Sequence, residues 1–316
     1  MVVTPALADA AVAYLAADGL LEPLLAALGD DVVAVRERLV LARAPNPAAD
    51  WWAANTWCEL RQQPIASIGD ANRWLRSMQR NWALYSTGHH RRAALIEGKL
   101  PPLRPKPLTF PSPVPSAPLG SWTLWQPDLV LASARCSSPF RHGEVAFVED
   151  HEGPPGRAYR KLWEALLLAG RWPAAGERCL DLGAAPGSWT WALQRLGASV
   201  LAVDKAPLEP RIAALPGVDA RRESAFGLDP ASVGPVDWLC SDVICYPERL
   251  LALVDRWRAA ALVRNFVCTI KFQGPGEHAA ARAFAAIPGS RVMHLHHNKH
   301  ELTWMLLERS GDRPGP

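Results

Sequence analysis

The second half of the chain alternates short apolar runs with stretches of helical spacing. Runs of this length, bounded by glycine, proline and polar residues, predict strands, and the segments between them predict helices. The predicted strands are Arg178–Gly183, Ser199–Asp204, Val218–Arg222, Val236–Asp242, Phe266–Phe272, Arg291–His296 and Leu302–Leu307. A helix is expected from Ala158, and others begin near Gly187, Leu208, Pro247 and Gly276. Regular alternation of this kind predicts an α/β domain with a mostly parallel sheet.

The last predicted strand follows its predecessor across a turn without an intervening helix. A parallel crossover needs a dozen or more residues, so the strand must run antiparallel to its neighbour. The sequence therefore predicts a doubly wound, Rossmann-like sheet with a reversed last strand.

The first half has a different character. Residues 1 to about 43 favour one or two short helices and a strand at Arg38–Ala42, and Asn72–Leu84 has helical spacing. Residues 101–118 contain eight prolines in eighteen positions, which predicts an extended linker or an ordered strap. Strand-like pieces follow at 122–125, 129–133 and 144–148. We expect a small α+β module over residues 1–150, with the proline-rich segment in it, and a second domain over residues 151–316.

Positive charge is concentrated in the first half. The net charge of the chain is +3. The segment from Arg61 to Lys106, however, contains nine lysines and arginines but only two acidic residues. Tryptophans and a tyrosine are interleaved with them, a mixture that suits RNA because guanidinium groups bind phosphate and rings stack on bases. The alternative is that the tryptophans are core and the arginines a solvated face. The candidate RNA-binding residues are Arg73, Arg76, Arg80, Arg91 and Arg92.

The cysteines and the N-terminal stretch indicate the cellular compartment in which the protein is expected. The six cysteines form no C-x-x-C pair, which favours reduced thiols in a cytoplasmic protein. The N-terminal stretch lacks the basic region of a signal peptide, and no apolar run is long enough for a bilayer, so no membrane partner is expected.

Four histidines near the C-terminus invite a metal hypothesis. His294 and His296 would share one face of the strand predicted there, but no cysteine or paired histidine completes a tetrahedral set. We therefore expect no metal, and we expect His297 and His300 to line an RNA entrance.

Residues 178–190 combine an apolar strand, a Gly-Ala-Ala-Pro-Gly turn and the start of a helix. Gly183 is expected to turn the backbone with a positive φ, and Gly187 to leave room for a ligand at the helix start. The next strand ends in Asp204, whose carboxylate is placed to accept hydrogen bonds from ribose hydroxyls. The pattern is that of a nucleotide-type site.

The glycine spacing limits the classes of ligand that this site could bind. The turn lacks the G-x-G-x-x-G of dinucleotide sites and the lysine of phosphate loops, so a ligand without phosphate fits better. Asp181 can bind an ammonium group there. The alternative is a tight strand–helix turn without a ligand.

This turn, D-L-G-A-A-P-G-S-W-T, resembles motif I of S-adenosylmethionine-dependent methyltransferases, and the FtsJ type in particular. The resemblance implies S-adenosyl-L-methionine as cofactor. The residues expected to bind it are Asp181, Gly183, Ala185, Pro186, Gly187, Ser188, Trp189, Asp204, Ser224 and Asp242.

Charged residues also stand at strand ends that should meet at one edge of the sheet. Asp242 and Lys271 end apolar strands, Glu301 begins the reversed strand, and Lys161 lies on the preceding helix. In this order they resemble the K-D-K-E tetrad of FtsJ-type ribose 2′-O-methyltransferases, with an RlmM-like branch acting on large-subunit ribosomal RNA as the nearest form. A lysine accepts a proton only when its pKa falls well below about 10.4, which desolvation and a second cation promote. The resemblance therefore implies Lys271 as general base, set by the other three residues; the alternative is a structural salt-bridge cluster.

Three functions remain open at this stage. The favoured one is an RNA ribose 2′-O-methyltransferase. A small-molecule O-methyltransferase would not need the basic segment, and a non-catalytic ribosome-assembly factor would not need the four charged residues. The sequence does not identify the nucleotide or the oligomeric state.

Overall fold

A computed structural model describes residues 5–274 and 279–308, which fold into two compact units. The first unit holds the residues up to Leu108 together with Val114–Ala146. The second holds Thr109–Pro113 together with the residues from Phe147 onward. Each unit is described by itself.

The second unit is built on a single sheet with the order β11-β10-β9-β12-β13-β15-β14 in the part of the chain that the structure describes. Its strands are β9 (Arg178–Leu182), β10 (Ser199–Asp204), β11 (Val218–Arg222), β12 (Val236–Ser241), β13 (Val263–Lys271), β14 (Ser290–Met293) and β15 (Glu301–Leu306). Strands β9 to β13 pair in parallel, whereas β15 lies antiparallel to both β13 and β14. The Rossmann-like sheet with a reversed last strand is confirmed.

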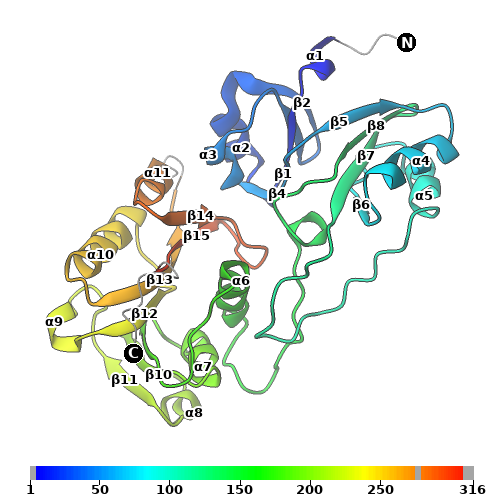
Figure 1. Cartoon of the computed structure of the whole chain (residues 1–316). Helices are drawn as coiled ribbons and strands as arrows, with labels where there is room; N and C mark the ends of the chain where they lie inside the picture. Colours follow the sequence, from blue (N-terminus) through cyan, green and yellow to red (C-terminus); the bar gives the residue numbers. More distant parts are fainter. Residues whose placement is uncertain (1–4, 275–278, 309–316) are drawn as a thin grey trace. The chain divides into compact units, whose positions relative to one another are not determined.

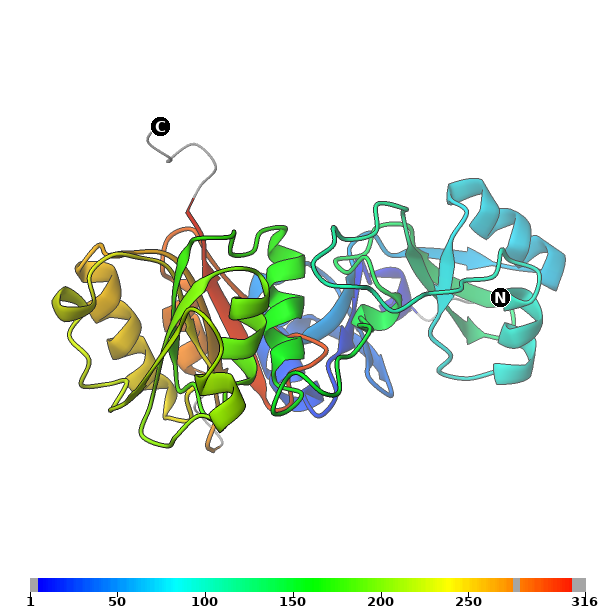
Figure 2. The same cartoon turned by 90° about the horizontal axis from the view of Figure 1, so that it is seen from below.

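Helices cover both faces of this sheet. Figures 1 and 2 show α6 and α7 on one face and α10 and α11 on the other. The helices are α6 (Tyr159–Ala169), α7 (Ser188–Arg195), α8 (Pro210–Ala213), α9 (Pro230–Val233), α10 (Pro247–Ala259) and α11 (Ala279–Ala285). The helix start predicted near Gly276 lies outside the described residues. Because both faces are covered, strands β9, β10, β12 and β13 are buried along most of their length and alternate little, whereas the edge strand β11 is mostly exposed.

One predicted strand was too long. Strand β14 ends at Met293, so His294 and His296 lie in the connection to β15 and do not share a strand face. The imidazole Nε2 of His294 lies 3.3 Å from the carbonyl oxygen of Lys299, which closes the connection on itself.

The first unit contains two four-stranded sheets within its described residues, of order β2-β3-β1-β4 and β5-β8-β7-β6. Its strands are β1 (Val12–Ala16), β2 (Val32–Arg36), β3 (Leu39–Ala42), β4 (Ala53–Trp57), β5 (Arg61–Pro64), β6 (Trp82–Leu84), β7 (Gly120–Gln126) and β8 (Leu129–Ser133). Its helices are α1 (Pro5–Ala8), α2 (Leu21–Leu28), α3 (Pro47–Asp50), α4 (Ile68–Met78) and α5 (His90–Glu97), with short 3-10 turns at Gly29–Asp31 and Arg141–Gly143.

Several predictions for this unit were wrong. Residues 1–43 contain two strands, β1 and β2, in addition to the one expected at Arg38–Ala42. Strand β1 was missed because it is completely buried and shows no alternation. The predicted helix over 72–84 ends at Met78, and Trp82–Leu84 is strand β6. Residues 144–148 form no strand.

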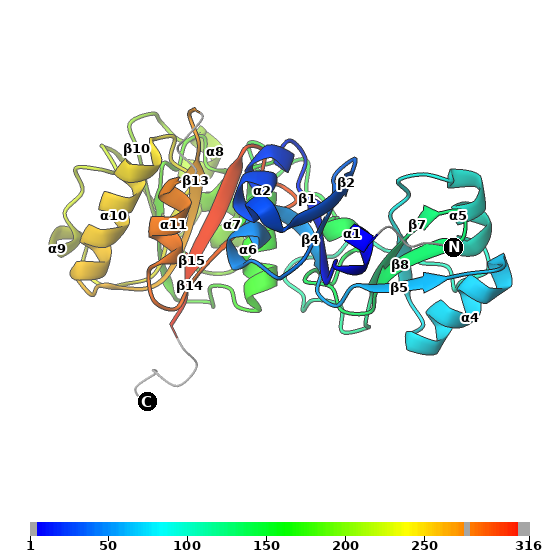
Figure 3. The ribbon, with the colours of Figure 1, turned by 90° about the horizontal axis from the view of Figure 1, so that it is seen from above.

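The tryptophans of the basic segment belong mainly to the core. Trp52, Trp57 and Trp82 are buried, and the indole Nε1 of Trp82 donates to the carbonyl oxygens of Leu75 and Gln79. Figure 3 shows α4 and α5 beside the β5-β8-β7-β6 sheet, against which their apolar faces pack. These buried rings are therefore not surfaces for unstacked bases.

Part of the proline-rich segment is an ordered strap. Phe110 is buried and its ring stacks on Trp163 of α6, with 5.2 Å between centroids. Phe147 and Trp172 meet the same ring edge-on. The aromatic cluster explains why Thr109–Pro113 belongs to the second unit.

Candidate active site

The turn after β9 has the conformation that its glycines predict. Gly183 has a φ of +79°, and a Cβ there would lie 2.7 Å from the Cα of Val243. Gly187 has a φ of +116° and stands directly before α7. A Cβ at Gly187 would meet the side chain of Ile212 at 2.7 Å, so the lack of a side chain at this position makes room for Ile212.

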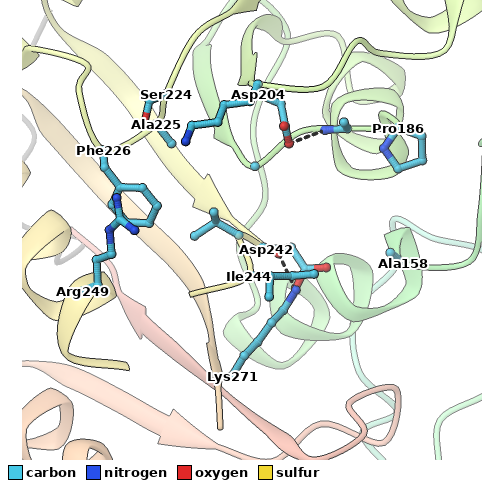
Figure 4. A pocket seen from close by; sticks show the side chains of 14 residues that line it. Ala158, Pro186, Asp204, Ser224, Ala225, Phe226, Asp242, Ile244, Arg249 and Lys271 are labelled. Atoms are coloured by element: carbon cyan, nitrogen blue, oxygen red, sulfur yellow. Dashed lines mark hydrogen bonds and ion pairs between the residues drawn. The ribbon is translucent and has the colours of Figure 1, made fainter. Parts of the chain in front are cut away.

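Asp204 is fixed by main-chain donors on both sides. Its Oδ2 accepts from the amide of Ala185 at 3.0 Å, and its Oδ1 accepts from the amide of Ala206 at 2.9 Å. The first bond ties the end of β10 to the glycine turn (Figure 4). Each carboxylate oxygen retains a further acceptor site for a ligand hydroxyl.

A cavity of about 470 Å³ opens at this edge of the sheet. Of the predicted site residues, Gly183, Ala185, Pro186, Asp204, Ser224, Asp242 and Lys271 line it. Sequence reasoning did not assign the other lining residues, which are Ala158, Lys205, Ala225, Phe226, Val243, Ile244 and Arg249. Val243 and Ile244 directly follow a strand end, which is a signal that could have found them. Arg249, whose guanidinium lies 3.9 Å from the centre of the Phe226 ring, gave no such signal (Figure 4).

Two predicted cofactor residues next to Gly187 are turned away from the cavity. The hydroxyl of Ser188 donates to the carbonyl oxygen of Gly156 at 3.1 Å. The indole Nε1 of Trp189 donates to the carbonyl oxygen of Ala158 at 2.9 Å. Both side chains therefore fasten α7 to the segment before α6.

Asp181 is completely buried in β9 and does not line the cavity. Its Oδ2 accepts from the hydroxyl of Thr190 at 2.6 Å, whereas its Oδ1 has no hydrogen-bond partner among the described residues. Burial, reinforced by the charges of Asp242 and Asp204, raises the pKa of Asp181 to about 7, although the Thr190 hydroxyl opposes the rise. A cation reaching this carboxylate would stabilise its ionised form.

The four charged residues of the predicted tetrad meet in one ion-pair network. The Nζ of Lys161 lies 3.0 Å from both carboxylate oxygens of Asp242 and 2.8 Å from Oε1 of Glu301. The Nζ of Lys271 lies 3.0 Å from Oδ1 of Asp242 and also donates to the Asp242 carbonyl oxygen. Their side chains are only 12 to 17% exposed. Figure 4 shows the ammonium group of Lys271 directed at Asp242 beside the cavity.

The topology produces this meeting. Asp242 directly follows β12 and Lys271 ends β13, which are parallel neighbours, so both stand at the carboxyl edge of the sheet. Glu301 begins β15, and the antiparallel register pairs it with Lys271. Lys161 reaches the same edge from α6.

The two lysines have different partners. Burial by itself lowers the pKa of Lys161, but the carboxylates of Asp242 and Glu301 outweigh burial and the pKa is raised. Lys161 is therefore a firmly protonated cation. Lys271 has one carboxylate partner in the network and lines the cavity, where it can meet a substrate.

The candidate RNA-binding arginines lie on two helices of the first unit. Arg73, Arg76 and Arg80 are exposed on α4 or just after it, and Arg73 pairs with Asp70 at 3.1 Å. Arg91 is exposed on α5, and Arg92 beside it is half-buried. The stretch therefore presents guanidinium groups to solvent.

Over residues 5–274 and 279–308, no group of three or more histidine, cysteine, aspartate or glutamate side chains is placed to hold a metal ion. In the same residues, no helix has the length and apolar character needed to cross a membrane.

Comparison with known proteins identifies the second unit. Residues 155–301 match the family model described as FtsJ-like methyltransferase, and this segment contains the glycine turn, the cavity and the four charged residues. Residues 155–301 are therefore similar to the FtsJ-like methyltransferases, and we call this segment the FtsJ-like domain. The chain is also 36% identical over 158 residues to "Ribosomal RNA large subunit methyltransferase M" of Halorhodospira halophila, covering 47% of this chain and 46% of that protein.

A second relative with the same name, from Thauera aminoaromatica, is 33% identical over 168 residues, covering 48% of this chain and 46% of that protein. The chain thus spans about half the length of the curated relatives it matches.

Proposed function

We propose that this protein transfers a methyl group from S-adenosyl-L-methionine to the 2′-hydroxyl of a ribose in RNA, with large-subunit ribosomal RNA as the substrate class. One observation carries the proposal: two lysines and two carboxylates form a largely buried network, and Lys271 and Asp242 of that network line the cavity beside the glycine turn.

The residues around the cavity fit this cofactor. The volume of about 470 Å³ lies within the range of roughly 300 to 1,000 Å³ that is usual for small-molecule sites. Asp204 would hold the ribose hydroxyls, and Ser224 and Ala225 would face the adenine. The buried Oδ1 of Asp181 has no partner among the described residues, as expected of a carboxylate that serves a cationic ligand. When bound, S-adenosyl-L-methionine supplies an electrophilic methyl group.

In the proposed mechanism, Lys271 removes the proton of the ribose hydroxyl at its Nζ. We assign this role to Lys271 and not to Lys161, because two carboxylates hold the proton of Lys161 whereas Lys271 lines the cavity. Lys161 contributes a positive charge to the same network as the base, since the Nζ atoms of both lysines lie 3.0 Å from Oδ1 of Asp242. Asp242 fixes both ammonium groups, and Glu301 fixes Lys161.

RNA as substrate is supported by two further findings. Relatives of the FtsJ-like domain are named as ribosomal RNA methyltransferases. The first unit presents exposed arginines on α4 and α5, a distribution that suits phosphate contacts. We propose Arg73, Arg76, Arg80, Arg91 and Arg92 as RNA-binding residues on this basis.

The direct test is methyl transfer from isotopically labelled cofactor to RNA, followed by nuclease digestion and mass spectrometry. The expected product is a 2′-O-methylated nucleoside in large-subunit ribosomal RNA. Labelling on a base, or labelling of small hydroxylated compounds but not of RNA, would contradict the proposal.

A further inference from the structure

Helix α6 binds the connection between β14 and β15, residues 294–300, through a residue that has no role in the proposed mechanism. Glu164 lies on α6 and is only 2% exposed. Its Oε1 accepts from the amide of His296 at 2.7 Å. Its Oε2 accepts from the amide of His297 at 3.0 Å and is 2.6 Å from the imidazole Nδ1 of the same residue. One buried carboxylate thus binds three nitrogen atoms of a segment far away in the sequence.

The imidazole of His297 is enclosed as a result. Its side chain is 8% exposed, and its ring packs against Phe147 at 5.5 Å between centroids. The expectation that His297 lines an RNA entrance was therefore wrong, whereas His300 is exposed. The rest of the connection is held as well, since Leu295 is buried and the side-chain Nδ2 of Asn298 donates to the hydroxyl of Thr303.

The held connection leads directly into the ion-pair network. Glu301 follows it, and its carboxylate binds Lys161 at 2.8 Å. Lys161 stands three residues before Glu164, so the two side chains leave the same side of α6. Glu164 of α6 therefore binds the connection, and Lys161 of the same helix binds Glu301, the residue directly after it. The two contacts together fix the position of Glu301.

We propose that Glu164 is a positioning residue for the ion-pair network: it sets the place of Glu301 through the 294–300 connection and thereby holds Lys161 beside Asp242 and Lys271. The consequence for catalysis rests on the proposed function. Glu164 touches neither the cavity nor the reacting atoms, because its carboxylate is taken up by His296 and His297.

The chemistry requires a carboxylate at this position. A glutamine has nearly the same shape but offers one acceptor oxygen, and its amide group would turn two donor hydrogens toward an N–H that also donates. A buried donor without an acceptor costs free energy, so Glu164→Gln should release one side of the connection without leaving a cavity.

The test is a double-mutant cycle of Glu164→Gln, Glu301→Gln and the two combined, measured as single-turnover methylation at saturating cofactor and RNA. Glu149→Gln is the matched control, because the carboxylate of Glu149 pairs with Arg157 and with Arg160 of the same helix. Glu164→Gln should slow the reaction roughly 10- to 100-fold, the usual effect of misplacing a catalytic group by about 1 Å. The double variant should be no slower than Glu301→Gln alone, because both changes act through one carboxylate.

Two outcomes overturn the inference. The effects of the two changes could multiply, which would show that Glu164 acts independently of Glu301. Alternatively, Glu164→Gln could match the control. Should Glu164→Gln fail to fold, His297→Leu and His297→Asn replace it: the leucine variant should be slow and the asparagine variant, which keeps a side-chain donor, should recover. Equal rates for the two would overturn the inference.

Hydrogen exchange separates this inference from the proposed function. Glu164→Gln should speed exchange of the amides of His296 and His297 about tenfold or more, whether or not the protein methylates RNA. Unchanged exchange over 294–301 would overturn the positioning role. An inactive wild-type protein with the expected exchange would instead contradict the proposed function alone.

Discussion

The pH dependence of stability tests the role proposed for Asp181 at the cofactor turn. Its carboxyl group is completely buried, and its pKa rises from 3.8 to about 7. Between these two values the folded protein holds a proton that the unfolded chain has lost. Stability therefore falls as pH rises through this window, and it levels off above the folded pKa.

The magnitude follows from the shift. One pKa unit corresponds to about 1.4 kcal/mol, so this group destabilises the unliganded protein by about 4 kcal/mol at pH 8 relative to its protonated form. Asp181→Asn removes the titration. Any cost of burying the new amide is independent of pH, so only the change of the difference with pH is diagnostic.

The assay is urea unfolding of the unliganded protein and of Asp181→Asn at pH 5, 6, 7 and 8. The stability of the variant relative to the wild type should rise by about 1.4 kcal/mol per pH unit from pH 5 to 7 and then flatten. Thr190→Val is the companion variant. It removes the hydroxyl that lowers the pKa of Asp181, so the flattening should move to higher pH. A difference between wild type and Asp181→Asn that stays constant with pH would refute the reasoning.

The same group links to the cofactor. A bound cation favours the ionised carboxylate, so binding near pH 7 should release a proton. Isothermal titration of S-adenosylmethionine in buffers of different ionisation enthalpy should show this release in the wild type and lose it in Asp181→Asn. An identical buffer dependence in the two proteins would place the cationic part of the ligand elsewhere.

Three further predictions concern the ligand, the RNA and the strap. Asp204→Ala should weaken S-adenosylmethionine binding about tenfold or more in isothermal titration, because it removes a carboxylate acceptor of the ribose hydroxyls; unchanged affinity would contradict the proposed role. Replacing Arg73, Arg76 and Arg80 together by alanine should reduce the slope of log affinity for RNA against log salt by about 2, near 0.7 per lost phosphate contact on single strands; an unchanged slope would place the RNA surface elsewhere. Phe110→Ala should destabilise the second unit by about 3 kcal/mol in thermal or urea unfolding, as large-to-small changes of buried aromatics do; an effect below about 1 kcal/mol would mean that the strap is not part of the core.

The sequence predicted the FtsJ-like sheet well because most of its strands are short apolar runs between turn residues. Strands β10 and β11 have the predicted bounds, and the missing helix before β15 predicted its reversal. The strand ends then placed Asp242, Lys271 and Glu301 at one edge, and the structure brings these three together with Lys161.

The first unit was predicted less well for a physical reason. Strand β1 is buried on both faces and lies in an alanine- and leucine-rich stretch, where periodicity does not separate a strand from a helix. The role of Trp82 was also hidden, since only the packing of α4 shows that its indole lies in the core.

The holding role of Glu164 could not be predicted for a related reason. Its partners are His296 and His297, more than 130 residues away along the chain, and a charged residue on an amphipathic helix is ordinarily solvated. The cavity wall at Arg249 was likewise hidden, because its place depends on how α10 packs and not on a strand end.

The central claim is that Lys271 takes the ribose proton during methyl transfer to RNA. The most direct measurement is the single-turnover rate of ribose methylation for wild type, Lys271→Ala and Lys271→Arg, together with their affinities for S-adenosylmethionine. Both variants should lose about 10²- to 10⁴-fold in rate, the usual contribution of a general base, with nearly unchanged cofactor affinity. Arginine should not rescue the rate, because a guanidinium stays protonated and cannot accept the proton. Substantial methylation by Lys271→Arg would contradict the account, since it would show that this position needs only a positive charge.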